Sequence, residues 1–254
     1  MILFWRNIIF SLCLLLPSHI LAVDISEKLV VNFATEANYF PFEYVDDKEL
    51  IQGFDIDIAN AICQAANLVC YFHNHSFGSL LLTLQFGRFD AVIAALDITE
   101  ERLSKVDFSN SYYQIPPVFV SPVSAQNEFS IVDKSIGVQT NSSNHHYLLQ
   151  HAKENSFIIS YFSSSEAFRD LSQGKIDMVF ADKAVVVDFL LKDKNSSKFS
   201  INKTEKLFTE KYSSGYGIAV KKGNTPLLER LNYGLTKIKK EGRYKEIFSR
   251  YFKY

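Results

Sequence analysis

Strand-like and helix-like segments alternate along most of this chain. The runs KLVVNFA (28–34), LVCYF (68–72) and FDAVIAAL (89–96) are apolar enough for buried strands, and FDIDIANAICQAAN (54–67) places apolar residues on one helical face. The alternation continues through further strand-like segments: VFVSPV, SIGVQ, FIISYF and KIDMVFA. Strands separated by helices in this way predict an α/β fold, in which mainly parallel strands are covered by helices.

A short internal repeat points to two similar halves. The segments LQFGRFDAVIAALD (84–97) and LSQGKIDMVFAD (171–182) share Leu, Gly, a basic residue, an Asp and then an apolar strand that ends in an acid. In open α/β sheets, ligands bind at the carboxyl ends of the strands. Asp97 and Asp182 are therefore predicted to face each other across a cleft between two lobes.

Composition and missing motifs narrow the function. The 254 residues can form one large domain or two modest ones, and a formal net charge of -1 without a basic block argues against nucleic acid as a partner. The sequence has no Gly-x-Ser-x-Gly motif, no phosphate-binding glycine loop and no His-Glu-x-x-His pair. We therefore expect no cofactor and no metal, and hydrolase or nucleotidase activity has little support.

The first 22 residues are typical of a secretory signal peptide. Arg6 is the only charge before the apolar run from Ile8 to Leu16, and Ala22 fits a position before the cleavage site. An N-terminal membrane anchor is the weaker alternative, because the run is shorter than the roughly 20 residues that a membrane span needs. We expect cleavage near Ala22 and a soluble, exported mature chain.

Two cysteines remain after the expected cleavage. Cys63 and Cys70 lie at the end of the predicted helix and in the next predicted strand. Two nearby cysteines in an exported protein favour a disulfide, with two buried thiols as the alternative. A metal site is less favoured than either, because the chain lacks the Cys and His spacings that would supply further ligands.

Several side chains are suited to a small zwitterion. Arg102 follows a strand end and can hold a carboxylate through two parallel hydrogen bonds; its alternative is a surface ion pair with a neighbouring Glu. Asp182 ends the other apolar strand and can accept an ammonium group, or it can cap the helix that follows. Tyr39 and Phe77 could enclose a flat cation, although aromatic side chains are more often core residues.

Five segments, in order along the chain, resemble the polar amino-acid-binding proteins of bacterial ABC importers, and the arginine-binding members in particular. They are GFDIDIANAIC, NHSFGSL, FDAVIAALDITEER, GKIDMVFAD and EGRYKEIFSRYF. The resemblance implies the two-lobed periplasmic-binding-protein fold of type II (the Venus flytrap), with a mixed sheet flanked by helices in each lobe and two hinge strands. By position, lobe 1 is discontinuous (23–113 and 214–254) and lobe 2 is inserted (114–213). The crossings fall near Tyr113 to Pro117 and near Lys211 to Ser214.

The resemblance also implies which residues meet the backbone groups of an amino acid. Arg102 corresponds to the residue that binds the α-carboxylate, assisted by Ser143 and by the backbone near Ala95 and Thr99. Asp182 corresponds to the acid that binds the α-ammonium group.

Five further residues would enclose the ligand side chain. By position, Tyr39 and Phe77 bracket it, and Glu36 and Gln139 meet its far end. Asp97 stands where histidine-binding relatives carry Ser, while arginine-binding relatives share the DIT motif. This motif favours arginine over histidine as the ligand.

These observations predict a monomeric, exported solute-binding protein that captures a cationic L-amino acid, L-arginine foremost, and delivers it to an ABC transporter permease. A lysine, ornithine or histidine binder of the same family is one alternative, and an exported dehydratase of the same fold is another. An anionic dehydratase substrate would require added basic residues, whereas Glu36, Asp97 and Asp182 make this site acidic. A sensory ligand-binding domain is a further alternative.

Overall fold

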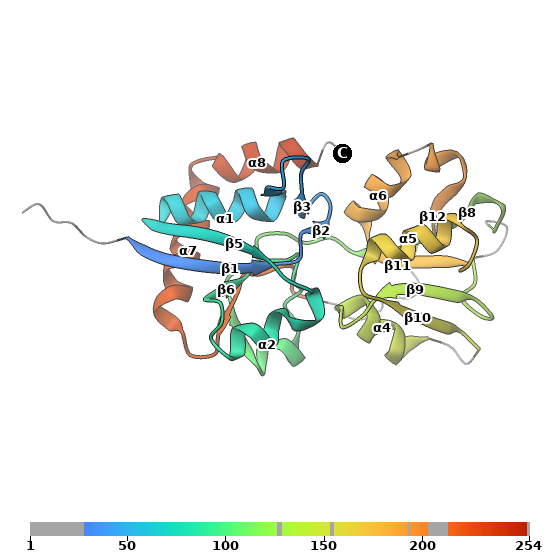
Figure 1. The fold of residues 1–254 in the computed structure, drawn as a ribbon, viewed down its shortest axis with the longest axis horizontal. Coiled ribbons are helices and arrows are strands. Elements are labelled where there is room, and N and C mark those ends of the chain that lie inside the picture. Colours follow the sequence, from blue (N-terminus) through green and yellow to red (C-terminus); the bar gives the residue numbers. More distant parts are fainter. Residues whose placement is uncertain (1–27, 126–128, 153–154, 193, 203–212, 253–254) are drawn as a thin grey trace, which may run out of the picture.

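The computed structural model describes residues 28–125, 129–152, 155–192, 194–202 and 213–252. Figure 1 shows two halves side by side, each a twisted β-sheet with helices packed on it. The predicted α/β architecture with two lobes is confirmed. Both sheets are mixed, as the family resemblance implies, whereas the alternation of strands and helices alone predicts mainly parallel strands. The expected signal peptide lies outside the described residues.

The first lobe contains a five-stranded sheet in the order β5-β1-β6-β13-β7. Its strands are β1 (Leu29–Thr35), β5 (Leu68–Asn74), β6 (Ala91–Val92), β7 (Val106–Phe108) and β13 (Ala219–Lys221). The strand β1 pairs in parallel with β5 and β6, whereas β13 runs antiparallel to β6 and β7. Strands from both ends of the described chain therefore build one sheet.

Apolar side chains on both faces of this sheet explain its layers. Val31 and Phe33 of β1 belong to the core cluster shared with α1, α7 and α8, and Ala34 packs in a separate cluster with α2. The helices of this lobe are α1 (Phe54–Ala65), α2 (Leu80–Gln85), α3 (Glu100–Leu103), α7 (Thr225–Lys240) and α8 (Arg243–Tyr251), with a 3-10 turn at Phe77–Ser79 before α2. The alternation of inward side chains along β1 thus fixes helices on both faces.

The second lobe contains a five-stranded sheet in the order β10-β9-β11-β8-β12. Its strands are β8 (Pro117–Pro122), β9 (Ser135–Gln139), β10 (Phe157–Tyr161), β11 (Met178–Asp182) and β12 (Phe199–Asn202). Its helices are α4 (Ser143–His151), α5 (Ser164–Ser172) and α6 (Lys183–Leu191), with 3-10 turns at Val123–Ala125 and Asn195–Ser197. Within β11, Val179 packs in the cluster with α5 and α6, while Phe180 packs in the cluster with α4.

A small three-stranded sheet in the first half precedes α1. It consists of β2 (Asn38–Tyr39), β3 (Glu43–Val45) and β4 (Ile51–Gln52), paired antiparallel. Gly53 follows β4 with φ of 130°, and an added Cβ there would overlap the carbonyl of Phe42. The absence of a side chain at this position therefore lets the start of α1 pack tightly against the segment before β3.

The chain passes between the two sheets twice. After β7 it continues to β8, and Tyr113 on this passage forms an isolated antiparallel bridge with Tyr216 on the return to β13. Lys211 and Tyr212 of the second expected crossing lie outside the described residues. The lobe boundaries at 113/114 and 213/214 stay predictions.

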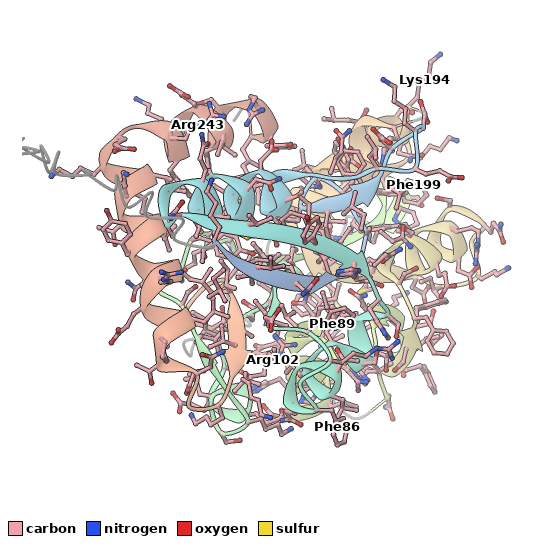
Figure 2. All side chains as sticks on the ribbon, turned by 60° about the vertical axis from the view of Figure 1, so that its left-hand side comes forward. Phe86, Phe89, Arg102, Lys194, Phe199 and Arg243 are labelled. Atoms are coloured by element: carbon pink, nitrogen blue, oxygen red, sulfur yellow. A yellow bond between two sulfur atoms is a disulfide. The ribbon has the colours of Figure 1, made fainter. Side chains whose placement is uncertain are left out.

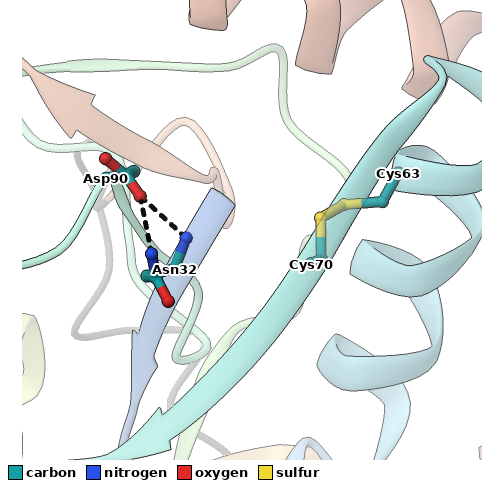
Figure 3. Close-up of a disulfide and its surroundings, with 4 residues drawn as sticks. All are labelled: Asn32, Cys63, Cys70 and Asp90. Atoms are coloured by element: carbon teal, nitrogen blue, oxygen red, sulfur yellow. Dashed lines mark hydrogen bonds between the residues drawn. A yellow bond between two sulfur atoms is a disulfide. The ribbon is translucent and has the colours of Figure 1, made fainter. Parts of the chain in front are cut away.

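The predicted disulfide is confirmed, and the alternative of two buried thiols is wrong. Cys63 near the end of α1 is bonded to Cys70 in β5, as Figure 3 shows. The same close-up shows Asn32 of β1 donating two hydrogen bonds to Asp90 Oδ2, from its backbone N–H and its side-chain amide, which tie β1 to the residue before β6. The disulfide links α1 to β5, the strand on which this helix packs.

Removing this disulfide should reduce stability without changing ligand affinity. A loop closed between two cysteines seven residues apart constrains the unfolded chain. The double variant Cys63→Ser/Cys70→Ser is expected to lose about 2 kcal/mol of unfolding free energy and about 4–8 °C in melting temperature. Calorimetric melting measures this loss. Reductant should lower the melting temperature of the unchanged protein but not that of the double variant; equal melting temperatures for the two proteins would contradict the expectation.

Candidate ligand-binding site

A small internal cavity of about 10 Å³ lies where the two lobes meet. Its lining comes from both lobes: Tyr39, Glu43, Phe77, Ala94, Ala95, Asp97, Arg102, Gln139, Ser142, Ser143, Asn144 and Asp182. This volume holds about one water molecule, so the side chains of the site largely contact one another. The structure thus brings together most of the site residues predicted from the sequence, and Glu36 joins them through Gln139.

The turn after β6 departs from the predicted strand. The apolar run was expected to be extended through Leu96, but regular pairing ends at Val92. Ala95 adopts φ of 44°, and its backbone N–H donates to Asp55 Oδ2 at 2.7 Å instead of to a neighbouring strand. A left-handed conformation costs a non-glycine residue about 1–2 kcal/mol, so this peptide is held by its surroundings. The turn presents Ala95 and Asp97 to the cavity.

Arg102 lies in α3 and points into the site. Thr99 caps this short helix, with its Oγ1 accepting from the Arg102 backbone N–H at 3.3 Å. The guanidinium donates from Nη1 to the Asp97 carbonyl at 3.0 Å and from Nη2 to the Asn141 carbonyl of the other lobe at 3.3 Å.

The surroundings of Arg102, which is labelled in Figure 2, argue against a surface role. The residue is only 8 % exposed, and its guanidinium carbon lies 5.7 Å from the centre of the Phe77 ring. Glu101 instead forms an ion pair with Lys105. The alternative of a surface ion pair for Arg102 therefore does not fit the structure.

Asp182 ends β11 and is buried. Its Oδ2 accepts from the Tyr39 hydroxyl at 2.7 Å and from the Tyr216 hydroxyl at 2.5 Å, and its Oδ1 accepts from Asn144 Nδ2 at 3.2 Å. Although Asp182 stands at the N-cap of α6, its side chain makes no cap hydrogen bond. Burial raises the pKa of this carboxyl, and the hydrogen bonds from Tyr216, Tyr39 and Asn144 oppose the rise.

Asp97 lies near Asp182, as the internal repeat predicted. The Ser143 hydroxyl of the other lobe donates to Asp97 Oδ2. Burial, followed by the charge of Asp182, raises the pKa of Asp97 to about 6. Two neighbouring buried carboxyl groups of one sign favour a ligand that brings positive charge between them.

Glu36 and Gln139 connect the lobes at another point. Gln139 Nε2 donates to Glu36 Oε2 at 2.7 Å, and both residues are buried. Burial raises the pKa of Glu36 to about 7, and the hydrogen bond from Gln139 opposes this rise. A nearby cation would favour the ionised form of this carboxyl.

The two predicted aromatic residues lie at different parts of the site. Tyr39 contacts Asp182 through its hydroxyl and stacks on Phe42, with ring centres 5.9 Å apart. Phe77 begins the 3-10 turn before α2 and faces Arg102. Whether they bracket a ligand side chain stays a prediction.

Six residues of the site were not among those predicted from the sequence. Four of them line the cavity: Glu43, Ala94, Ser142 and Asn144. Tyr216 donates to Asp182, and Asn141, with φ of 58°, directs its carbonyl to Arg102. Glu43 offered one signal, since it is an acid within the aromatic stretch YFPFEY. Tyr216 offered none, because it joins the site only through the folding of the chain between the lobes.

The described residues offer no metal site and no membrane-spanning helix. Among the described residues, no group of three or more His, Cys, Asp or Glu side chains could hold a metal ion. His73 instead contacts Asn32, and His75 contacts Ser79. Nor does the described part of the chain contain a helix long and apolar enough to cross a membrane.

Comparison with known proteins identifies the family. Residues 31–254 match the profile of the bacterial extracellular solute-binding proteins, family 3. The chain belongs to this family. The match covers nearly everything after the expected signal peptide, and it confirms the resemblance found in the sequence.

Individual relatives of this solute-binding protein are also named as amino-acid-binding proteins. ABC transporter arginine-binding protein 1 of Escherichia coli (strain K12) is 38% identical over 243 residues, which cover 95% of this chain and 97% of that protein. A histidine-binding periplasmic protein of the same strain is 27% identical over 231 residues, or 87% of each chain.

A solved structure is also similar. It is that of a Salmonella typhimurium periplasmic binding protein described for its high arginine specificity, with a TM-score of 0.79 and 34% identity over 88% of this chain and 99% of that one. The family consists of binding proteins, and these relatives are named as such, which favours the binding-protein interpretation over the dehydratase alternative.

Proposed function

We propose that this protein binds a cationic L-amino acid, L-arginine foremost, between its two lobes and delivers it to the permease of an ABC transporter. The observation that carries the proposal is the charge of the site. Four buried carboxyl groups, from Glu36, Glu43, Asp97 and Asp182, accompany one buried guanidinium, from Arg102. This excess of acids favours a ligand with two positive groups and one carboxylate, because each charge that the ligand brings out of water then gains a partner.

One set of proposed contacts holds the α-carboxylate and the α-ammonium group of the ligand. Arg102 binds the α-carboxylate, with Ser143 and the backbone near Ala95 and Thr99 assisting, and Asp182 binds the α-ammonium group. The positions of Arg102 and Asp182 support these roles, since both side chains are buried and line the cavity.

The ligand side chain would extend past Tyr39 and Phe77, which we propose bracket it. Its cationic end would meet Glu36 and Gln139, and Asp97 would add negative charge nearby. The buried hydrogen bond between Glu36 and Gln139 supports this placement, because a guanidinium offers several donors to both oxygen-bearing side chains.

Binding would couple to movement of the lobes. A cavity of about 10 Å³ cannot admit an amino acid, and contacts such as Tyr39 to Asp182 and Gln139 to Glu36 join the lobes directly. The lobes must therefore separate before the ligand enters, and the ligand then replaces these contacts when they close. Because the ligand meets both lobes only in the closed form, it shifts the population toward that form. The permease would recognise the closed shape.

We further propose that the protein acts in the periplasm as a monomer, after cleavage of the signal peptide near Ala22. The extracellular character of the family and the disulfide, which persists in oxidising compartments, support export. The two similar proteins named for arginine support arginine over histidine as the ligand.

Calorimetric titration of the ligand-free mature protein tests the proposal. We expect L-arginine to bind most tightly in a panel with lysine, ornithine, histidine and glutamine. A rise in melting temperature with each ligand provides a second readout, since a ligand that binds only the folded state stabilises it. Absence of both heat and thermal shift with every cationic amino acid would reject the proposal, and tightest binding of histidine or lysine would replace arginine as the ligand.

The raised pKa of Glu36 predicts that arginine binds more weakly as the pH falls. Glu36 has a pKa of about 7 without ligand. The cation requires the ionised form, so below this pH binding must first remove a proton, at a cost of about 1.4 kcal/mol per pH unit. The dissociation constant is expected to rise about tenfold from pH 8 to pH 6. Asp97, with a pKa of about 6, adds a steeper rise at lower pH.

Titrations across this pH range, with the variant Glu36→Gln beside the unchanged protein, measure the effect. The variant should bind more weakly at pH 8 and lose the dependence above pH 6, because Gln cannot titrate. Glu49→Gln, at an exposed position, serves as the matched control and should retain the full dependence. An identical pH profile in Glu36→Gln would contradict the assignment.

A further inference from the structure

Two acids outside the proposed ligand contacts lie together at one wall of the site, where Glu43 lines the cavity. Glu43 in β3 is 1 % exposed, and Asp55 in the first turn of α1 is fully buried. Their segments are joined by backbone hydrogen bonds, from Phe54 N–H to the Pro41 carbonyl and from Asp55 N–H to the Phe42 carbonyl, both at 2.9 Å. The side chains come within hydrogen-bonding reach of each other.

The two carboxyl groups lack a donor between them. Glu43 Oε2 and Asp55 Oδ1 are both buried, and neither has a hydrogen-bond partner among the described residues. Two ionised carboxylates can only accept hydrogen bonds, so an ionised pair would leave both oxygens unsatisfied and would place two like charges together. One proton on the pair satisfies both oxygens at once.

The remaining contacts indicate which acid carries the proton. Asp55 Oδ2 already accepts from the Ala95 backbone N–H at 2.7 Å and from the Tyr112 hydroxyl at 2.6 Å, and donors favour an ionised acceptor. Burial raises the pKa of Asp55, whereas burial and then the charge of Asp55 raise the pKa of Glu43 well above its usual range. The titratable groups that act on this pair from its surroundings are acids and tyrosines: Glu36, Asp182, Tyr39, Tyr112 and Tyr244.

We propose that Glu43 stays protonated at neutral pH and donates a hydrogen bond to Asp55, and that this acid pair positions the Ala95 peptide at the ligand site. Glu43 and Asp55 are thus positioning residues. The protonated pair carries one negative charge, which holds the N–H of a residue in the left-handed conformation with φ of 44°. A neutral Glu43 also keeps a further charge away from Asp182, which acts on it electrostatically.

The location of the proton can be tested without any ligand. Infrared spectra of the ligand-free mature protein at about pH 8.5, where Glu36 is ionised, should contain the C=O stretch of a protonated carboxylic acid. The variant Glu43→Gln should lose this band, and the surface variant Glu49→Gln should retain it. Absence of the band in the unchanged protein, or its persistence in Glu43→Gln, would overturn the assignment.

The positioning role, which rests on the proposed function, is tested by arginine affinity. Glu43→Gln retains a neutral donor and should bind within about threefold of the unchanged protein, whereas Glu43→Met leaves Asp55 Oδ1 unsatisfied and should bind at least about tenfold more weakly. Rescue by Gln separates donation from mere filling of space. Equal affinities of the Met variant and the unchanged protein would overturn the role, as would a Gln variant as weak as the Met variant.

If Glu43→Met does not fold, Tyr112→Phe takes its place. It removes one of the two hydrogen bonds to Asp55 Oδ2 and should weaken binding about threefold to tenfold, and unchanged affinity would overturn the role. The infrared band can behave as expected while neither the unchanged protein nor any variant binds an amino acid. In that case the proposed function fails and the protonated pair stands.

Discussion

Replacing Arg102 with Met should weaken binding of L-arginine by about 100-fold or more, and replacing it with Lys by at least about tenfold. The guanidinium donates to two carbonyl groups on different lobes, from Nη1 to Asp97 and from Nη2 to Asn141. A planar guanidinium can instead offer two parallel hydrogen bonds to one carboxylate, which the single ammonium of Lys cannot reproduce. Calorimetric titration with L-arginine gives both affinities.

The Met variant should lose more because it leaves the buried α-carboxylate without a partner. Arg88→Lys, an exposed position with a cation–π contact to Phe89, is the matched control and should leave affinity unchanged. If Arg102→Lys binds L-arginine as tightly as the unchanged protein, the bidentate role is wrong, although the residue can still be needed for folding. Melting curves of both Arg102 variants distinguish that outcome.

Local patterns along the chain predicted the fold and the disulfide. The alternation of apolar runs with amphipathic stretches depends on neighbouring residues, and it placed Cys63 on a helix and Cys70 on the strand beside it before the structure confirmed their bond. The repeat that ends in Asp97 and Asp182 likewise predicted two acids at one cleft, and both line the cavity.

The parts that failed depend on contacts between distant residues. The strand expected through Leu96 ends at Val92, because Asp55 captures the Ala95 N–H from a helix 40 positions earlier. Likewise, the side chain of Asp182 does not cap α6, since Tyr39 and Tyr216 donate to it from the other lobe. Such competition between a local and a distant partner is decided by the tertiary structure, and the sequence alone does not contain it in a readable form.

Replacing Asp182 with Asn should separate binding from stability. We expect affinity for L-arginine to fall by at least about 30-fold, because the buried α-ammonium group loses its charged partner. The ligand-free variant should melt no lower than the unchanged protein. Burial disfavours the ionised carboxyl of Asp182 and raises its pKa, so the folded protein carries a cost at neutral pH that a neutral amide avoids.

The pH dependence of the melting temperature tests whether the ionised Asp182 carboxyl lowers stability. An acid whose pKa is raised on folding binds more protons in the folded state, so its effect on stability becomes less favourable as the pH rises from the unfolded value toward the folded one. The melting temperature of the ligand-free protein should therefore rise relative to that of Asp182→Asn as the pH falls below the raised pKa of Asp182 toward the unfolded value of about 4. Asp188→Asn in α6, the helix that follows Asp182, is the control and should leave ligand affinity unchanged; Asp188 forms an ion pair with Lys192. Unaltered arginine affinity in Asp182→Asn would show that Asp182 does not bind the ammonium group. A loss of affinity together with a large drop in melting temperature would show that the fold itself requires the carboxylate.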